Sequence, residues 1–109
     1  LGRLSGAVDP LLSPTLAPPP PPLGLIDQDM DDLDRFLDLT ARFIPFTPLY
    51  NMIGGPAISL PLDTDAAGLP IGSMLGAPLG GEERLLMVAG QLERAHPWWH
   101  RLPPEPAQG

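Results

Sequence analysis

The sequence contains neither cysteine nor lysine among its 109 residues. The missing cysteines exclude disulfide bonds and thiolate metal sites, and with them a small secreted scaffold held together by disulfides. Six arginines stand against 13 acidic residues, which gives a net charge of −7. A protein that binds DNA or RNA needs several basic side chains to displace counterions from the phosphates. We therefore expect no nucleic-acid partner.

Long apolar runs are also missing. No stretch approaches the roughly 18 apolar residues that a membrane-spanning helix needs. Asp9, Pro10 and Pro14 interrupt the N-terminal segment, so a signal peptide is not indicated. These absences predict a cytoplasmic chain that has no membrane partner. The first residue is Leu1 rather than Met, which suggests a fragment or a processed product.

Proline and glycine, in contrast, are abundant, with 17 and 12 residues, a share close to that of low-complexity chains. The hydrophobic content of 43 % favours a chain that packs. Pro18 to Pro22 form an unbroken run, for which we expect polyproline II within a proline-rich loop over 17–26. Such a run either spans a surface or binds an aromatic groove of a partner. Residues 103–109 are predicted to form a tail.

Apolar periodicity predicts five elements, in the order strand, helix, strand, strand, helix. In chain order, they cover residues 8–16, 27–43, 57–62, 69–75 and 82–95. A polar loop over 63–68 joins the second and third strands into an antiparallel hairpin. The second strand is a short apolar run and is expected to be buried on both faces.

Acidic residues and glycines mark the ends of these elements. Asp29, Asp31 and Asp32 crowd the start of the first helix, where carboxylates cap free N–H groups. Gly54 is predicted to take a positive φ in a turn, and Gly72 to mark a close approach of two backbones. Because two paired strands are marginal alone, the predicted fold class is α/β, a C-terminal piece of a mixed twisted sheet flanked by helices, incomplete by itself.

Metal-binding patterns are weak in this sequence. The spacing of Asp27, Asp29 and Asp31 imitates a calcium loop, but Asp32 occupies the position where that loop needs glycine. His96 and His100 are separated by Pro97, which breaks the helix that would align them on a zinc ion. The acidic residues are better explained as a helix start, and the two histidines as surface residues. We expect no metal and no cofactor.

Nucleophile and nucleotide motifs are also weak. Ser59 lies inside a predicted strand and Ser73 follows a strand glycine, so both are interpreted as small packing residues. Gly80 and Gly81 are not part of a phosphate-binding motif. The residues alone therefore predict a chain without catalytic groups.

Four motifs occur in a characteristic order. Residues 11–16 read L-L-S-P-T-L, residues 46–61 read F-T-P-L-Y-N-M-I-G-G-P-A-I-S-L-P, residues 68–72 read G-L-P-I-G, and the helix over 82–95 is followed by P-W. Over about residues 7–102, these motifs resemble the C-terminal part of the amidase-signature family. Residues 72–80 look closest to the branch that includes the nylon-oligomer cyclic-dimer hydrolases.

The resemblance implies an amide hydrolase that needs no metal. In that family, a serine attacks the amide carbonyl, a second serine relays protons and a lysine acts as the base. These groups belong to the N-terminal half of the domain, and this sequence has neither a lysine nor the glycine- and serine-rich loop. We therefore expect the chain to be inactive alone, and its partners to be the N-terminal remainder of the domain and a small linear or cyclic amide. A homodimer of the full-length protein also fits.

The resemblance also implies substrate-binding residues. The end of the first helix and the residues after it approach the substrate in the family, and Ile44, Phe46 and Thr47 occupy those positions here. The apolar Ile44 favours a hydrophobic acyl group. Two alternatives stay open: the three residues only pack against the sheet, or the chain is a non-enzymatic module whose polyproline run and acidic helix bind a partner.

Overall fold

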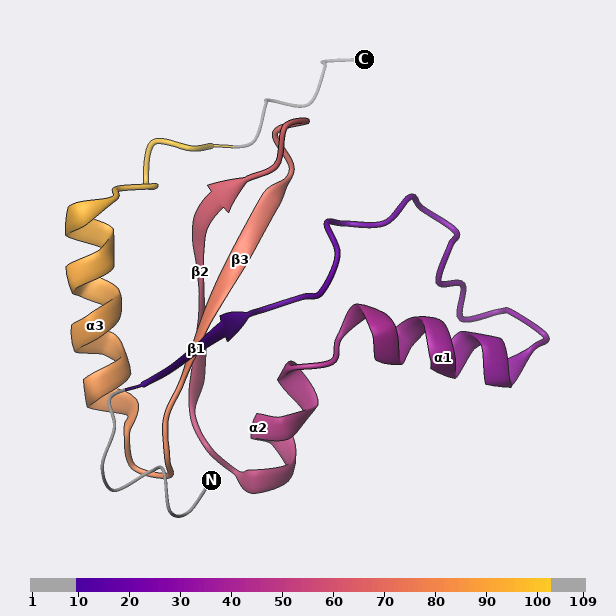
Figure 1. Ribbon diagram of the computed structural model, residues 1–109, viewed down its shortest axis with the longest axis horizontal. Helices are drawn as coiled ribbons and strands as arrows, with labels where there is room; N and C mark the ends of the chain where they lie inside the picture. The colour runs from indigo at the N-terminus through magenta and orange to yellow at the C-terminus, as the bar shows by residue number, and fades with distance from the viewer. Residues whose placement is uncertain (1–9, 103–109) are drawn as a thin grey trace.

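A computed structural model describes residues 10–102 of the chain (Figure 1). Its elements are, in order, β1 (Leu11–Pro14), α1 (Leu33–Phe43), α2 (Thr47–Ile53), β2 (Ala57–Thr64), β3 (Pro70–Gly76) and α3 (Glu82–Ala95). The predicted α/β class and the order of the five predicted elements are confirmed, with α2 as an additional helix. The predicted tail lies outside the described residues. No helix within 10–102 is long and apolar enough to cross a membrane.

The three strands form one antiparallel sheet in the order β1-β3-β2. The predicted hairpin of β2 and β3 is confirmed. Its loop is held by Asp65, whose carboxylate accepts the N–H groups of Ala67 and Leu69 at 2.8 Å. Gly68 allows the turn because its φ of 82° lies in the left-handed region.

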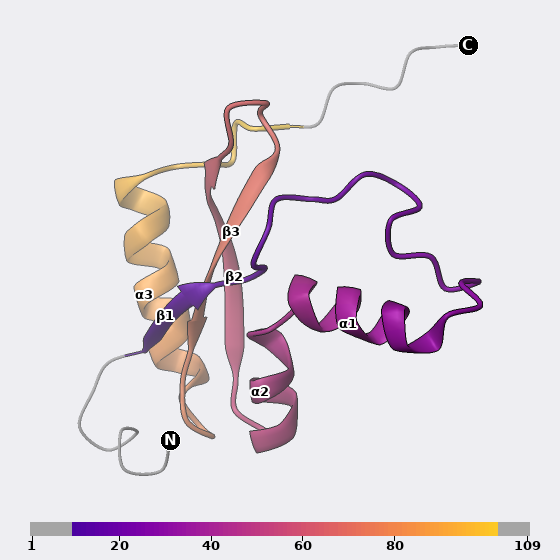
Figure 2. The same cartoon turned by 45° about the vertical axis from the view of Figure 1, so that its right-hand side comes forward.

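Helix α3 covers one face of the sheet, and α1 and α2 lie on the other side (Figures 1 and 2). The main core cluster lies between the sheet and α3 and consists of Leu60, Leu75, Ala77, Leu85 and Ala89. On β2, only Leu60 is buried, while Ala57, Ser59 and Pro61 are exposed on the alternate positions. The prediction that this strand is buried on both faces is therefore wrong for the described structure, since the residues of its second face are exposed.

Helix α1 begins at Leu33 rather than at residue 27 as predicted. Asp32 is its N-cap and accepts the N–H of Arg35 at 3.0 Å, whereas Asp27 accepts the N–H of Asp29 in a local turn. Aspartate side chains compete in this way with helical hydrogen bonds, so they end a helix more readily than they extend it. The acidic cluster thus lies before the helix, and only its last member caps it.

Helix α2 was not predicted from the sequence pattern. It spans seven residues, with Pro48 in its first turn. Backbone N–H groups in the first turn have no acceptor within the helix, so the missing N–H of proline costs no helical hydrogen bond there. Gly54 ends it with a φ of 66°, which confirms the turn predicted there. Tyr50 is the buried residue of this helix and packs against Gly76 of β3. The helix is thereby fixed on the sheet face opposite α3.

Strand β1 is shorter than the predicted 8–16, of which residues 8 and 9 lie outside the described part. Beyond it, residues 15–32 contain neither helix nor strand. Figure 1 shows them as a long connection that runs away from the sheet and leads into the start of α1. The N–H of Ala17 donates to the carbonyl of Phe43 at 3.2 Å. This bond ties the start of the proline-rich loop to the end of α1.

Candidate functional site

The predicted substrate-binding residues lie at the junction between α1 and α2. Ile44 is the C-cap of α1 and donates its N–H to the carbonyl of Thr40 at 3.0 Å. Phe46 is the N-cap of α2, and Thr47 is its first residue. All three are half-buried. The junction places Ile44 and Thr47 in two different hollows, and Phe46 lines neither of these two.

The first hollow is apolar and has a volume of about 500 Å³. It is lined by Leu37, Thr40, Ala41, Ile44, Pro45 and Pro48. Thr40 is its one polar residue, and the Oγ1 atom of this threonine is buried without a hydrogen-bond partner in the described structure. A hydrocarbon chain fits such a wall, because it needs no hydrogen bonds.

The second hollow carries hydroxyl and amide groups and has a volume of about 300 Å³. Its lining comes from the segment after β1, from α2, from β2 and from β3: Thr15, Thr47, Tyr50, Asn51, Gly55, Ala57, Ser59 and Met74. Thr47 and Asn51 are one turn apart on α2 and contribute a hydroxyl and a carboxamide. These groups both donate and accept hydrogen bonds, as recognition of an amide requires.

A hydrogen bond that spans β3 joins two of the residues that line this second hollow. Thr15 Oγ1 and Ser59 Oγ lie 2.6 Å apart, although 44 positions separate the residues in the sequence. Both hydroxyls sit over Gly72, where a Cβ atom would lie 2.7 Å from Thr15 Oγ1 and 2.9 Å from Ser59 Oγ. The close approach predicted at Gly72 is confirmed, and its physical reason is this pair of hydroxyls.

Sequence reasoning did not single out Thr15 and Asn51 as site residues. Both belong to the motifs quoted above, the T of L-L-S-P-T and the N of F-T-P-L-Y-N. The motifs could have identified them, since polar residues repeated in otherwise apolar motifs are candidates for a site. Their position together in one hollow depends on two tertiary features: β1 pairs with β3, and α2 packs on β3 through Tyr50.

The weaker candidates are far from a catalytic arrangement. The hydroxyl of Ser59 bonds to Thr15 rather than to a base. His96 and His100 are exposed, as predicted, at the far end of α3. Within residues 10–102, no three His, Asp or Glu side chains come together as metal ligands would.

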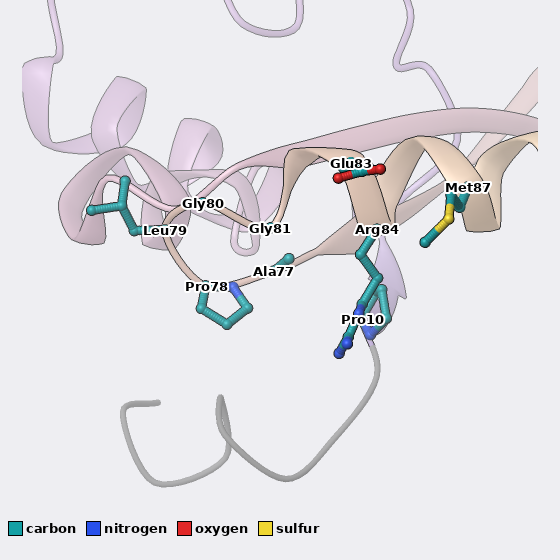
Figure 3. A pocket seen from close by; sticks show the side chains of 9 residues that line it. All are labelled: Pro10, Ala77, Pro78, Leu79, Gly80, Gly81, Glu83, Arg84 and Met87. Carbon is teal, nitrogen blue, oxygen red and sulfur yellow. The ribbon is translucent and has the colours of Figure 1, made fainter.

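A third pocket lies away from the α1–α2 junction, at the start of α3 (Figure 3). It has a volume of about 420 Å³ and lies between Pro10, the loop from Ala77 to Gly81, and the first turns of α3. Figure 3 shows Pro10 beside Arg84, with Leu79 and Met87 at the two ends of the pocket. Sequence reasoning predicted no site here.

Comparison with known proteins defines the class of this chain. The profile of the family described as Amidase matches residues 2–86. The chain belongs to this family, and it corresponds to a C-terminal portion of the family's domain, as its motifs predicted.

Two named relatives and one solved structure make the relationship more specific. The chain is 44 % identical over 96 residues to the "Putative amidase AmiC" of Mycobacterium tuberculosis (strain ATCC 25618 / H37Rv), covering 88 % of this chain and 20 % of the relative. It is 39 % identical over 100 residues to the 6-aminohexanoate-cyclic-dimer hydrolase of Paenarthrobacter ureafaciens, covering 87 % and 20 %. A solved 6-aminohexanoate cyclic dimer hydrolase superposes with a TM-score of 0.70 at 37 % identity, covering 88 % and 21 %. The chain thus spans about a fifth of the length of these proteins.

Proposed function

We propose that this chain is the C-terminal part of an amidase that hydrolyses non-peptide carboxamides by a Ser-Ser-Lys mechanism. The two serines and the lysine would reside in the rest of the domain, and this chain, which has no lysine, would be inactive alone. The observation that supports the proposal most is the likeness to the cyclic dimer hydrolase, which holds in both structure and sequence over 88 % of the chain. No cofactor is needed for this chemistry.

The contribution of this chain would be part of the substrate pocket. We propose that Ile44 contacts the hydrocarbon part of an amide, since it lines the apolar hollow beside Pro45 and Pro48. Thr47 lines the other hollow, where its hydroxyl would hold a polar group of the substrate. Phe46 lies between them in the chain and would set the relative position of the two hollows.

A separate interaction module is less well supported. The family match includes the run from Pro18 to Pro22, so these prolines belong to the amidase domain. Pro18, Pro19 and Pro20 also line a small hollow with Pro70, Ile71 and Gly72 at the start of β3. This position beside the sheet favours an intramolecular role for the proline run.

A complementation experiment tests the proposal. The full 109-residue chain is co-expressed with the Paenarthrobacter hydrolase from which the matching fifth has been removed, an assembly that we call the complemented domain. We expect the complemented domain to hydrolyse 6-aminohexanoate cyclic dimer, and the chain alone to have no activity, because the reacting groups lie in the larger part.

The control for this experiment is the hydrolase's own matching segment, supplied as a separate polypeptide. Activity restored by that segment but not by this chain, although this chain associates, would contradict the proposed function. Turnover by this chain alone would contradict the assignment of the catalytic residues to the rest of the domain.

Substitutions at the α1–α2 junction test the substrate-binding residues. In the complemented domain, Ile44→Asp is expected to raise the KM for the cyclic dimer by about tenfold or more, because apolar contact with a side chain of this size contributes 1.5–3 kcal/mol. Thr47→Val should raise the KM by about three- to tenfold through the loss of one hydrogen bond. Met52→Asp is the control, since Met52 is 77 % exposed on α2 and lines neither hollow. Equal effects of all three substitutions would indicate that the junction only packs against the sheet.

A further inference from the structure

The second hollow is polar but carries no charge. Its hydrogen-bonding side chains include those of Thr15, Thr47, Asn51 and Ser59, and no arginine, histidine, aspartate or glutamate is among its lining residues. A carboxylate or an ammonium group placed there would meet no opposite charge among these residues, and an unpaired charge is costly to remove from water. The hollow therefore fits a neutral polar group.

The hydroxyls of Thr15 and Ser59 act together as one hydrogen-bond donor. Their oxygens lie 2.6 Å apart, and either hydroxyl can donate to the other. Whichever of them donates, its proton is used within the pair, and the other hydroxyl keeps its own proton free. The pair thus offers one O–H group to a ligand in the hollow, and the carbonyl oxygen of an amide is a suitable acceptor for it.

Asn51 adds an acceptor and a donor of fixed character. Its carbonyl oxygen can only accept a hydrogen bond, and its NH2 group can only donate. The residue is exposed on α2, so its carboxamide can reach a ligand. A ligand that satisfies both groups needs an N–H and a C=O side by side. A carboxamide has this combination, whereas an ester lacks the N–H and an alkyl group lacks both.

The two hollows lie beside each other at the start of α2. Thr47 lines the polar hollow, and the next residue, Pro48, lines the apolar one together with Ile44. A molecule that occupies both hollows would place a hydrocarbon segment against Ile44 and Pro48 and a neutral polar group beside Thr47. The two linings together describe a ligand with a hydrocarbon segment that ends in a carboxamide.

No residue that lines the polar hollow is arranged to attack an amide. The hydroxyl of Ser59 is bonded to Thr15 rather than to a base, and the chain has no lysine. In the proposed mechanism, the two reacting serines and the lysine belong to the rest of the domain. A carboxamide in this hollow is therefore held in place, and another carboxamide of the same molecule meets the reacting groups.

We propose that the polar hollow is a subsite for a carboxamide of the substrate that is not cleaved, and that Asn51 selects this group. The inference rests on the proposed function in one respect, that the substrate is an amide. The substrate class is then an amide whose hydrocarbon part carries a second carboxamide. An alkyl end in the same place would leave the polar groups of the hollow unpaired, and sites built for hydrogen bonding reject such analogues strongly.

A binding experiment tests the subsite without turnover. Asn51 is the only asparagine of the chain, so labelling the asparagine of this chain with ¹⁵N gives one side-chain NH2 group to follow by NMR in the complemented domain. We expect hexanediamide to shift this NH2 signal and to bind about tenfold or more tightly than hexanamide, which has a methyl group in place of the second carboxamide. Equal affinity of the two amides, or an Asn51 signal that does not move, would overturn the proposal.

A change of charge at Asn51 provides a second test. Asn51→Asp keeps the shape of the side chain but replaces its NH2 group by a negatively charged oxygen. In the complemented domain, we expect the preference for hexanediamide over hexanamide, as a ratio of kcat/KM values, to fall about tenfold. The preference for 6-aminohexanamide, whose free end is an ammonium group, should rise by about the same factor, because the new carboxylate pairs with this charge.

Met52→Asp is the matched control. It places the same charge on the next residue of α2, which is 77 % exposed and lines neither hollow, so it should leave both preferences unchanged. A loss by the same factor for all three amides in Asn51→Asp would mean that Asn51 only supports α2, and it would overturn the proposal.

The outcomes separate the subsite from the proposed function. Hydrolysis of hexanamide and hexanediamide without any preference would contradict the subsite and leave the amidase proposal standing. Binding of hexanediamide at Asn51 without hydrolysis of any amide, although the hydrolase's own segment restores activity, would uphold the subsite and contradict the proposed function instead.

Discussion

Replacing Gly76 by valine is expected to destabilise the complemented domain by about 3 kcal/mol, the upper part of the range for overpacked sites. The aromatic ring of Tyr50 lies directly on the backbone of Gly76, so that any Cβ there would overlap its ring atoms. Tyr50 is 7 % exposed and is the buried residue of α2. The substitution therefore displaces α2 from the sheet and disturbs the hollow to which Thr47 and Asn51 belong.

Two controls distinguish this contact from a general effect of replacing glycine. Gly90→Ala in α3 should leave stability unchanged or raise it by up to about 1 kcal/mol, since its nearest neighbour is the flexible end of Arg94 at 3.5 Å. Gly76→Ala should cost less in a Tyr50→Ala background than in the native one, because the smaller side chain leaves room for the new methyl group. Urea unfolding measures all of these variants, and an equal cost of Gly76→Ala in both backgrounds would contradict the contact.

The elements predicted well are those whose signals are local. The bounds of α3 agree with the prediction, because two glycines precede it, Pro97 follows it and its apolar positions recur at helical spacing. The hairpin was also predictable, since its polar loop ends in glycine. In both cases, neighbouring residues alone determine where the element begins and ends.

The elements predicted poorly depend on tertiary contacts. Helix α2 has only seven residues and contains a proline, so its periodicity is too short to detect, and its position depends on Tyr50 packing on β3. The start of α1 was predicted too early. Aspartate is common both as an N-cap and in the first turn of a helix, so the sequence does not show which aspartate is the cap. The burial of β2 was overestimated because an apolar run does not reveal how many of its faces are covered.

The candidate site was predictable only in part. Ile44, Phe46 and Thr47 were identified through family motifs, and the structure places them at one junction. The pairing of Thr15 with Ser59 could not be predicted from spacing, because it depends on β1 and β2 lying on either side of Gly72 in β3. The strand order determines which residues line a hollow, and no local sequence pattern encodes this order.

The attachment of α3 to the sheet should depend on one side chain more than on any other in that helix. Leu85 is 3 % exposed and, with Ala89, provides the buried contacts of α3 with Leu60 and Leu75. Leu85→Ala is expected to destabilise the complemented domain by about 3 kcal/mol, within the range for leucines removed from a core. Ala89 is too small to fill the resulting cavity.

The adjacent residue provides a matched control for this prediction. Leu86 has the same side chain in the same helix but is 64 % exposed, so Leu86→Ala should change the free energy of unfolding by less than about 0.5 kcal/mol. Equal destabilisation by the two substitutions, measured by urea unfolding, would mean that α3 presents a different face to the sheet. The described packing of α3 on Leu60 and Leu75 would then be wrong. The proposal that the substrate binds on the opposite face of the sheet would be wrong with it.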